Sequence, residues 1–189
     1  TLMAQTLSTI LPPLSWEEVL EVSKIYSVAN KLQTDEKILQ KRPFRIIHHT
    51  ASAISLVGGG RVPIPGEISL AHKGVLFMDE LPEFPSSVLE VLRQPLEDKK
   101  ISVSRVNGAA EFPADFTLIA AMNPCPCGYY RVPHAKKPCT CSAMQIQKYQ
   151  KKISGPFMDR IDLYTNVSPV EFDKLYSDEL AESSASIRA

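Results

Sequence analysis

Apolar residues along this chain occur in two alternating patterns, short continuous runs and longer stretches with helical spacing. Continuous runs are typical of strands that are buried on both faces. Such runs cover residues 45–47, 74–78, 116–122 and 161–167. Helical spacing covers residues 1–10, 67–72 and 87–96, and a further helix is expected after Ser15, which forms a capping box with Glu18. Strands interleaved with helices predict an α/β fold with a mainly parallel sheet.

Residues 99–112 follow a different pattern. Residues 101–104 alternate between apolar and polar side chains, Asn107-Gly108 is a turn signal, and residues 109–112 supply a return strand. The pattern predicts an antiparallel β-hairpin inserted between two strands of the parallel sheet.

The composition of the chain is that of an ordinary globular domain. It has 189 residues, of which 44% are hydrophobic and 22% charged. Lys and Arg total 21, as do Asp and Glu, so any contact with DNA must be local. No apolar run approaches the roughly 18 residues of a membrane helix and no export signal is visible, so we expect a cytoplasmic protein with no membrane partner. Both ends look cut, and we expect a fragment of a longer protein.

The strongest chemical signal is the acidic pair Asp79-Glu80, which directly follows the apolar run 74–78. Two carboxylates at the carboxyl end of a buried strand point into the crevice where α/β sheets bind ligands. In a nucleotide hydrolase the first acid holds Mg²⁺ and the second polarises the attacking water. The alternative is a strand that runs into an acidic surface turn.

Asn123 ends the next apolar run and would lie beside Asp79-Glu80 if the two strands are neighbours. Its amide could then orient a water molecule against a γ-phosphate. A turn-forming role before Pro124 explains the residue equally well.

Several ordered motifs resemble those of the magnesium-chelatase-like AAA+ ATPases, over nearly the whole chain. They lie at residues 43–52, 56–60, 65–72, 74–84, 92–97, 123–128 and 153–163. The resemblance implies a P-loop NTPase of the AAA+ type, with a three-layer core, that binds and hydrolyses ATP with Mg²⁺. It also implies assembly into a homo-oligomeric ring, which we expect to be a hexamer.

The resemblance assigns a role to each candidate residue by its position. Asp79-Glu80 corresponds to the Walker B pair, and Asn123 corresponds to the first sensor residue. Arg160 corresponds to the arginine finger that reaches the ATP of a neighbouring subunit, a role that suits a permanently charged guanidinium. The alternative for Arg160 is a surface salt bridge with Asp159 or Asp162.

One departure from the family pattern concerns the phosphate loop. The chain contains no Gly-rich loop ending in Gly-Lys-Thr or Gly-Lys-Ser. Residues 1–4 look like the segment that follows this lysine, so Thr1 would be the Mg²⁺-binding hydroxyl. We therefore expect the phosphate-loop strand and the helical lid to be missing, and the fragment (residues 1–189 of an AAA+ core) to be inactive by itself.

The four cysteines form two Cys-x-Cys pairs, Cys125 with Cys127 and Cys139 with Cys141, in a loop at 124–142. Four thiolates can supply a tetrahedral Zn²⁺ site that orders such a loop. The related family shares these cysteines, which favours structural zinc. Reduced thiols in a flexible loop and disulfides in the oxidised fragment are the alternatives.

In the same resemblance, the hairpin at 99–112 corresponds to one that projects toward the pore of the ring. Lys99, Lys100 and Arg105 could then contact a DNA backbone. The alternative is a solvated hairpin with scattered basic residues.

Two functions of the parent protein follow from the resemblance. One is an ATP-driven motor of the branch-migration or helicase type that acts on DNA, which residues 81–84 and 123–128 favour. The other is a chelatase-type subunit that drives metal insertion into a porphyrin through a partner. A non-catalytic, zinc-stabilised interaction fragment is a third alternative.

Overall fold

The computed structural model describes the chain except for residues 1, 33–37, 106–107, 133–136, 168–181 and 189. Its centre is a parallel sheet of three strands in the order β1 (Phe44–Ile47), β4 (Val75–Met78) and β7 (Thr117–Ala120). Ile47 and Ala120 both lie opposite Met78 across the two ladders, so the three strands end at one level. The predicted α/β fold with a parallel sheet is confirmed.

The middle strand forms the centre of the core. All four side chains of β4 are at most 1% exposed, as the continuous apolar run predicts for a strand covered on both faces. Leu76 and Met78 pack in one cluster with side chains from the surrounding helices. Those side chains include Leu56, Ile68, Val88, Leu89 and Phe157.

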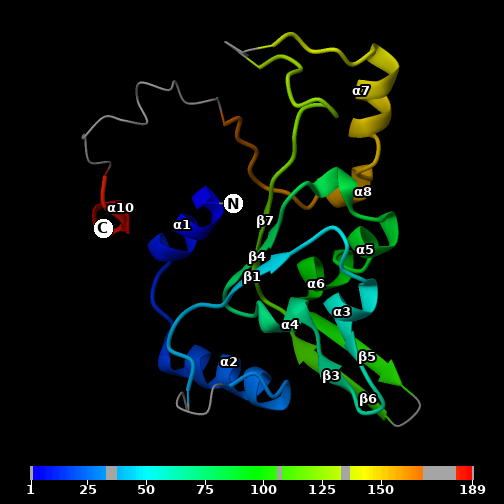
Figure 1. The fold of residues 1–189 in the computed structure, drawn as a ribbon. Helices are drawn as coiled ribbons and strands as arrows, with labels where there is room; N and C mark the ends of the chain where they lie inside the picture. Colours follow the sequence, from blue (N-terminus) through cyan, green and yellow to red (C-terminus); the bar gives the residue numbers. More distant parts are fainter. Residues whose placement is uncertain (1, 33–37, 106–107, 133–136, 168–181, 189) are drawn as a thin grey trace.

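Helices lie on both sides of this sheet (Figure 1). The helix α1 (Leu2–Ile10) is on one side, and α3 (Ala53–Val57), α5 (Ser86–Glu90) and α6 (Arg93–Asp98) are on the other. The helix α2 (Trp16–Val28) begins with the predicted capping box between Ser15 and Glu18. The short α4 (Glu67–Leu70) precedes β4. This arrangement matches the expected layered core.

The predicted helix at 87–96 is wrong as a single element, because the segment forms α5 and α6 with a turn between them. Pro95 provides the physical reason. A proline has no backbone N–H, and its ring collides with the carbonyl four residues earlier, here that of Val91. The helix therefore breaks at Val91 and Leu92, and a new one begins at Arg93.

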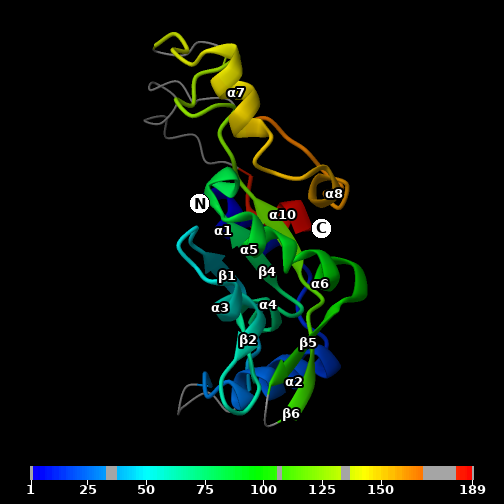
Figure 2. The same cartoon turned by 90° about the vertical axis from the view of Figure 1, so that its right-hand side faces the viewer.

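Two antiparallel hairpins extend from the sheet. One pairs β5 (Lys100–Arg105) with β6 (Gly108–Pro113), which confirms the predicted hairpin. The other is a two-residue ladder between β2 (Gly58–Gly59) and β3 (Ile64–Pro65). Figure 2 shows the β5–β6 hairpin at one end of the molecule and α7 (Ala143–Gln150) at the opposite end.

The remaining elements follow the carboxyl ends of β4 and β7. They are the 3₁₀-turn η1 (Leu81–Glu83), α7, α8 (Gly155–Met158) and α10 (Ser184–Arg188). Among the described residues, no helix combines the length and the apolar character that crossing a membrane requires.

The predicted strand at 161–167 is wrong, since this segment has no regular structure. A strand is stable only when a neighbour satisfies its backbone hydrogen bonds. In the described part of the chain, β7 is the last strand of the sheet and residues 161–167 do not pair with it. Ile161 packs against the core, but Leu163 is 89% exposed and Tyr164 is 64% exposed, so the segment is not buried as the predicted strand would be.

Candidate functional site

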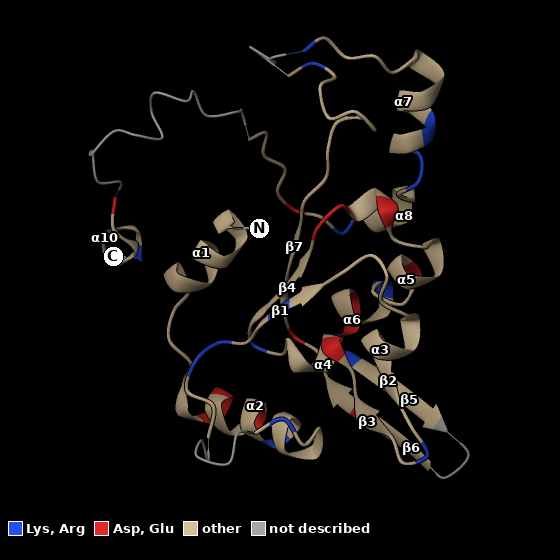
Figure 3. Ribbon diagram, viewed as in Figure 1, with Lys and Arg blue, Asp and Glu red and all other residues tan. Residues whose placement is uncertain are grey.

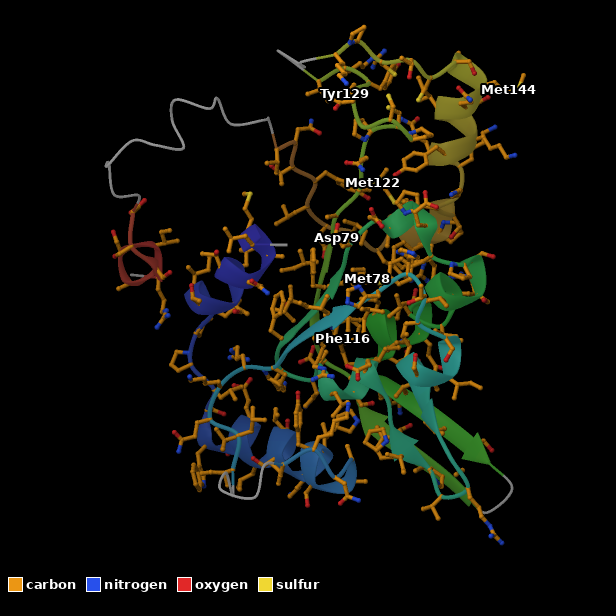
Figure 4. The ribbon with its side chains drawn as sticks, viewed as in Figure 1. Met78, Asp79, Phe116, Met122, Tyr129 and Met144 are labelled. Carbon is orange, nitrogen blue, oxygen red and sulfur yellow. The ribbon has the colours of Figure 1, made fainter. Side chains whose placement is uncertain are left out.

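The candidate site lies at the carboxyl ends of the three parallel strands. Figure 4 labels Asp79, just after β4, and Met122, just after β7, at this edge of the sheet. Figure 3 shows the acidic residues that follow β4 in red at the same edge. The backbone continues the pairing past the strands, since Ala121 N–H donates to Met78 O and Leu81 N–H donates to Ala121 O, both at 2.9 Å. The two strand ends therefore form one rigid platform.

Asp79 and Glu80 occupy this platform with different geometries. Asp79 is partly buried, and its Oδ1 accepts a hydrogen bond of 3.0 Å from the Glu80 N–H, which fixes the orientation of the carboxylate. Glu80 is exposed and has the left-handed backbone angles φ 53° and ψ 47°. A non-glycine residue in that region costs about 1–3 kcal/mol, and such strain is concentrated at functional sites. Carboxylate oxygens are the ligands that Mg²⁺ prefers, so the pair fits a magnesium site.

His49 is a third residue at this edge of the sheet. It lies two residues beyond β1, and its Nδ1 is 3.3 Å from Glu80 Oε2. The two side chains are 46% and 56% exposed. A contact between side chains so exposed is weak, so His49 restrains Glu80 only slightly.

Asn123 lies one residue past the position opposite Glu80, as expected for neighbouring strands. Its side chain faces the cysteine loop: a Cβ on Gly128 would be 4.0 Å from both Cγ and Oδ1 of Asn123. Its backbone lies beside the hydroxyl of Tyr149 on α7. The pKa of Tyr149 is raised, first by burial and further by the charges of Glu83 and Glu80. Asn123 is therefore held between the acidic platform and the cysteine loop.

Arg160 follows α8, whose Phe157 is fully buried and anchors the segment in the core. Its guanidinium forms an ion pair with Glu97 of α6 and donates a hydrogen bond to the carbonyl of Pro156. The Arg160 side chain is only 19% exposed. The salt-bridge partner is thus Glu97 of a distant helix, in place of the neighbouring aspartates Asp159 and Asp162 considered from the sequence.

Lys99 and Lys100 lie at the base of the β5–β6 hairpin. Lys99 Nζ is 3.2 Å from Asp115 Oδ1, and Lys100 Nζ is 3.0 Å from Glu111 Oε2 on the paired strand. Arg105 is opposite Gly108 at the other end of the ladder. At roughly 3.4 Å per residue, the five steps from Lys100 to Arg105 span about 17 Å, so the structure does not bring the three basic residues together. Thr1 is outside the described residues.

The four cysteines converge, and each offers a sulfur within 4.8 Å of the other three. Cys125 Sγ is 3.4 Å from Cys127 Sγ and 3.8 Å from Cys139 Sγ, and Cys127 and Cys139 are 3.5 Å apart. Cys125 is fully buried, and its sulfur accepts a hydrogen bond of 3.4 Å from the backbone N–H of Tyr130. Figure 4 shows this loop, with Tyr129 labelled, beyond the carboxyl end of β7. The donor set is that of a tetrahedral metal site.

The thiols of this cluster do not ionise equally. Hydrogen bonds from the backbone N–H groups of Tyr129 and Thr140 lower the pKa of Cys127 to about 6. The backbone N–H of Cys141 lowers the pKa of Cys139, but burial and the neighbouring thiols raise it to about 12. Thiolates at this spacing repel one another, so a bound cation is needed before all four can carry charge.

A cavity of about 500 Å³ lies elsewhere, between α2 and the base of the β5–β6 hairpin. Its buried titratable side chain is His72, whose Nδ1 accepts from the Asp115 N–H at 3.0 Å and whose Nε2 is 3.1 Å from Glu21 Oε2. Burial lowers the pKa of His72. Both ring nitrogens are used in structural contacts, so we assign the functional site to the strand ends.

A parallel α/β sheet with acidic side chains at the carboxyl end of its buried strand is the architecture of the P-loop NTPase class. Residues 1–175 match the family model described as magnesium chelatase, subunit ChlI, and the chain belongs to this family.

The chain is also similar to several individual proteins. The chain is 51% identical over 163 residues to the YifB protein of Salmonella typhimurium, a match that covers 86% of this chain and 31% of that protein. It is 45% identical over 190 residues to the competence protein ComM of Haemophilus influenzae, a match that covers 100% of this chain and 36% of ComM. The chain thus spans about a third of the length of these relatives. Among solved structures, NtrX from Brucella abortus in complex with ADP matches 42% of this chain and 19% of its own, with 25% identity and a TM-score of 0.35.

Proposed function

We propose that this chain is the hydrolytic core of an AAA+ ATPase, and that the parent protein uses ATP to move DNA, in the manner of a branch-migration motor. The observation that carries the proposal is the meeting of Asp79, Glu80, His49 and Asn123 at the carboxyl ends of three adjacent parallel strands. That edge of an α/β sheet is where ligands bind. Membership of the magnesium chelatase family supports ATP and Mg²⁺ as the ligands.

The platform residues have distinct roles in this proposal. Asp79, the acid of the Walker B pair, holds Mg²⁺, which would neutralise charge on the phosphates when bound. Glu80 is exposed at the strand end and accepts a proton from the attacking water. Asn123 orients that water from the adjacent strand. Thr1 supplies a hydroxyl to the same metal ion, as the family resemblance implies.

Arg160 acts in the proposal as an arginine finger toward the ATP of the neighbouring subunit, in a hexameric ring. Its present partner Glu97 is 57% exposed. An ion pair with one well-solvated partner is weak, so little free energy opposes transfer of the guanidinium to a phosphate of the next subunit. Lys99, Lys100 and Arg105 are proposed as DNA contacts. In the free chain Lys99 and Lys100 pair with Asp115 and Glu111, so DNA would compete with these carboxylates.

A chelatase-type function is the second candidate. The chain is 32% identical over 80 residues to the magnesium-chelatase 67 kDa subunit of Chlorobaculum parvum. This match covers 42% of the chain, compared with 100% for the competence protein. The proposal therefore favours the DNA motor over metal insertion into a porphyrin.

The test is ATP hydrolysis by the full-length protein and by its Glu80→Gln variant. Loss of a general base lowers turnover by about 10²- to 10⁴-fold. Glu80→Gln should therefore abolish most turnover while ATP binding remains. Glu90→Gln is the matched control, because Glu90 is an exposed carboxylate on α5, outside the strand ends. Equal rates for the wild type and Glu80→Gln would contradict the assignment of the base.

The nature of the substrate is tested with the same preparation. Branched DNA should stimulate the ATPase rate, and the Arg105→Ala variant should require a higher DNA concentration for the same rate. The salt dependence of that stimulation should also weaken, because one phosphate contact is lost. An ATPase that ignores DNA and responds only to a porphyrin-binding partner would support the chelatase function instead.

A further inference from the structure

We propose that Cys125, Cys127, Cys139 and Cys141 bind one Zn²⁺ ion, and that this centre positions Asn123 for ATP hydrolysis. The second part rests on the proposed function, while the first does not. The fit of the four sulfurs to a metal supports the zinc site, and the connection of the cysteine loop to Asn123 supports the positioning role.

The spacing of the sulfurs fits zinc. Zn–S bonds of about 2.3 Å in a tetrahedron place neighbouring sulfurs about 3.8 Å apart. The sulfurs of Cys125, Cys127 and Cys139 are 3.4–3.8 Å from one another, and Cys141 lies in the same group. A disulfide requires an S–S distance of about 2.0 Å, whereas these sulfurs are 3.4–3.8 Å apart and the four cysteines are free, at the spacing that one Zn²⁺ bound to all four would give.

The backbone around the sulfurs is arranged as it is around bound thiolates. The N–H of Tyr130 donates a hydrogen bond of 3.4 Å to the sulfur of Cys125. Such hydrogen bonds orient and stabilise the ligands of a metal. The loop has few apolar side chains of its own, so the sulfurs are the centre around which it is organised.

Both ends of the cysteine loop return to Asn123. At the first end, Cys125 follows Asn123 by two residues, and the side-chain amide of Asn123 lies against Gly128. At the second end, Cys141 is followed by Ser142, whose side chain caps α7 and completes a capping box with Gln145. The metal ligands thus connect the residue after β7 directly to the start of α7.

The helix α7, which begins after Cys141, also contacts the segment that contains Asn123. The hydroxyl of Tyr149, which is 6% exposed, lies beside the backbone of Asn123. Its neighbour Gln150 donates from Nε2 to the carbonyl of Pro124 at 3.2 Å. Beyond the helix, Lys152 Nζ is 3.0 Å from Glu83 Oε2, next to the acidic pair. Asn123 is therefore held from both sides by segments that the four sulfurs join, and Tyr149 is a positioning residue.

The first experiment measures metal in the full-length protein purified without chelators. About one zinc ion per chain is expected, since four thiolates complete the tetrahedral shell. The Cys139→Ser and Cys141→Ser variants, which change two of the half-buried ligands, should lose it. Ser142→Ala is the control, because it removes the cap of α7 without touching a sulfur. Replacement of zinc by Co²⁺ should give the absorption bands of tetrahedral thiolate coordination. Wild-type protein without zinc, and without those bands after addition of Co²⁺, would overturn the metal site.

The second experiment measures hydrogen exchange at the backbone amide of Asn123, a measurement that needs no ATPase activity. Removal of zinc should speed exchange in the peptide that contains Asn123, and return of zinc should restore protection. Tyr149→Phe removes the hydroxyl that lies beside the Asn123 backbone, so it should speed the same exchange while the zinc content stays unchanged. Exchange at Asn123 that is indifferent to zinc would overturn the positioning role, whatever the outcome of the ATPase assays.

The third experiment measures turnover. Misplacement of a catalytic group by about 1 Å can cost about 100-fold in rate, so zinc removal and Tyr149→Phe should each lower kcat by about 10- to 100-fold while KM for ATP stays unchanged. In the Asn123→Ala background neither change should lower kcat further, because their effect passes through Asn123. Additive losses would overturn the coupling. A wild-type protein without ATPase activity would refute the proposed function, and the zinc content would still decide the metal site.

Discussion

The ion pair between Arg45 of β1 and Glu67 of α4 provides a quantitative test of the fold that supports the site. Arg45 Nε is 2.6 Å from Glu67 Oε2, and Arg45 Nη2 is 2.9 Å from Glu67 Oε1. The two side chains are 28% and 21% exposed. This bidentate contact fixes β1, whose end carries His49, against the segment that leads into β4. We expect Glu67→Gln to weaken it without changing the size of the side chain.

The magnitude follows from the two hydrogen bonds. Each bond to a charged partner contributes about 1.5–3 kcal/mol, and the neutral amide of the Glu67→Gln variant retains one bond of about 1 kcal/mol. With allowance for partial exposure, the loss is about 2 kcal/mol. The entropy of unfolding, about 2.1 cal/mol/K per residue, is about 0.4 kcal/mol/K for 189 residues. The Tm should therefore fall by about 5 °C.

The pH dependence of this loss has a defined sign. Burial raises the pKa of Glu67, but the hydrogen bonds and charge of Arg45, with a smaller effect of Lys31, outweigh it and hold the pKa below its ordinary value. A carboxylate with a lowered folded-state pKa stabilises the protein above its unfolded pKa, and this contribution disappears as the pH falls through the folded value. The difference between wild type and Glu67→Gln should be complete at pH 7 and should shrink below about pH 4.3.

Urea unfolding of the 189-residue chain at a series of pH values measures both quantities. Lys31→Ala is the matched control, because Lys31 also reaches Glu67 Oε1, at 3.2 Å, but is 44% exposed. An exposed pair of this kind contributes at most about 1 kcal/mol. A Glu67→Gln effect no larger than that of Lys31→Ala, or one that is the same at pH 7 and at acid pH, would refute the reasoning.

Three further predictions concern the backbone, the nucleotide and the subunit interface. Gly66→Ala should destabilise the chain by more than about 3 kcal/mol in urea unfolding, because its Cβ would be 2.3 Å from Leu56 O and 2.4 Å from Gly58 N; a loss below about 1 kcal/mol would contradict this close approach. The 189-residue chain alone should bind ATP weakly, because it contains no Gly-Lys-Ser or Gly-Lys-Thr loop; micromolar affinity in a titration with fluorescent nucleotide would be incompatible with that expectation. Mixing full-length Arg160→Ala and Glu80→Gln subunits should restore some ATPase activity if Arg160 acts on the neighbouring ATP, whereas a mixture as inactive as its components would argue against a role between subunits.

The main elements of the sheet could be predicted because their signals are local. A continuous apolar run such as 74–78 identifies a strand buried on both faces, and the structure shows β4 at most 1% exposed. The capping box at Ser15 and Glu18 likewise depends on residues within one helical turn. Pro95 also indicates a helix break, but the helical spacing of the surrounding leucines favoured the prediction of one continuous helix.

The failures came from interactions between distant segments. Residues 161–167 have the composition of a strand, yet composition does not supply a neighbour with which to pair. The alternative for Arg160, a salt bridge with the adjacent Asp159 or Asp162, considered only neighbours in sequence, whereas its partner Glu97 lies 63 residues away.

His49 shows how topology can convert an ambiguous residue into a member of the site. His48 and His49 offered no motif of their own, because a histidine after a strand is as often a polar strand end as a functional group. Once β1 is known to pair in parallel with β4, with Ile47 opposite Met78, the register places His49 opposite Glu80. The same register on the other side of β4 places Asn123 one step beyond Glu80. The candidate site is therefore a consequence of strand order: three segments separated by about 30 to 40 residues bring His49, Glu80 and Asn123 to one edge of the sheet because parallel strands end together.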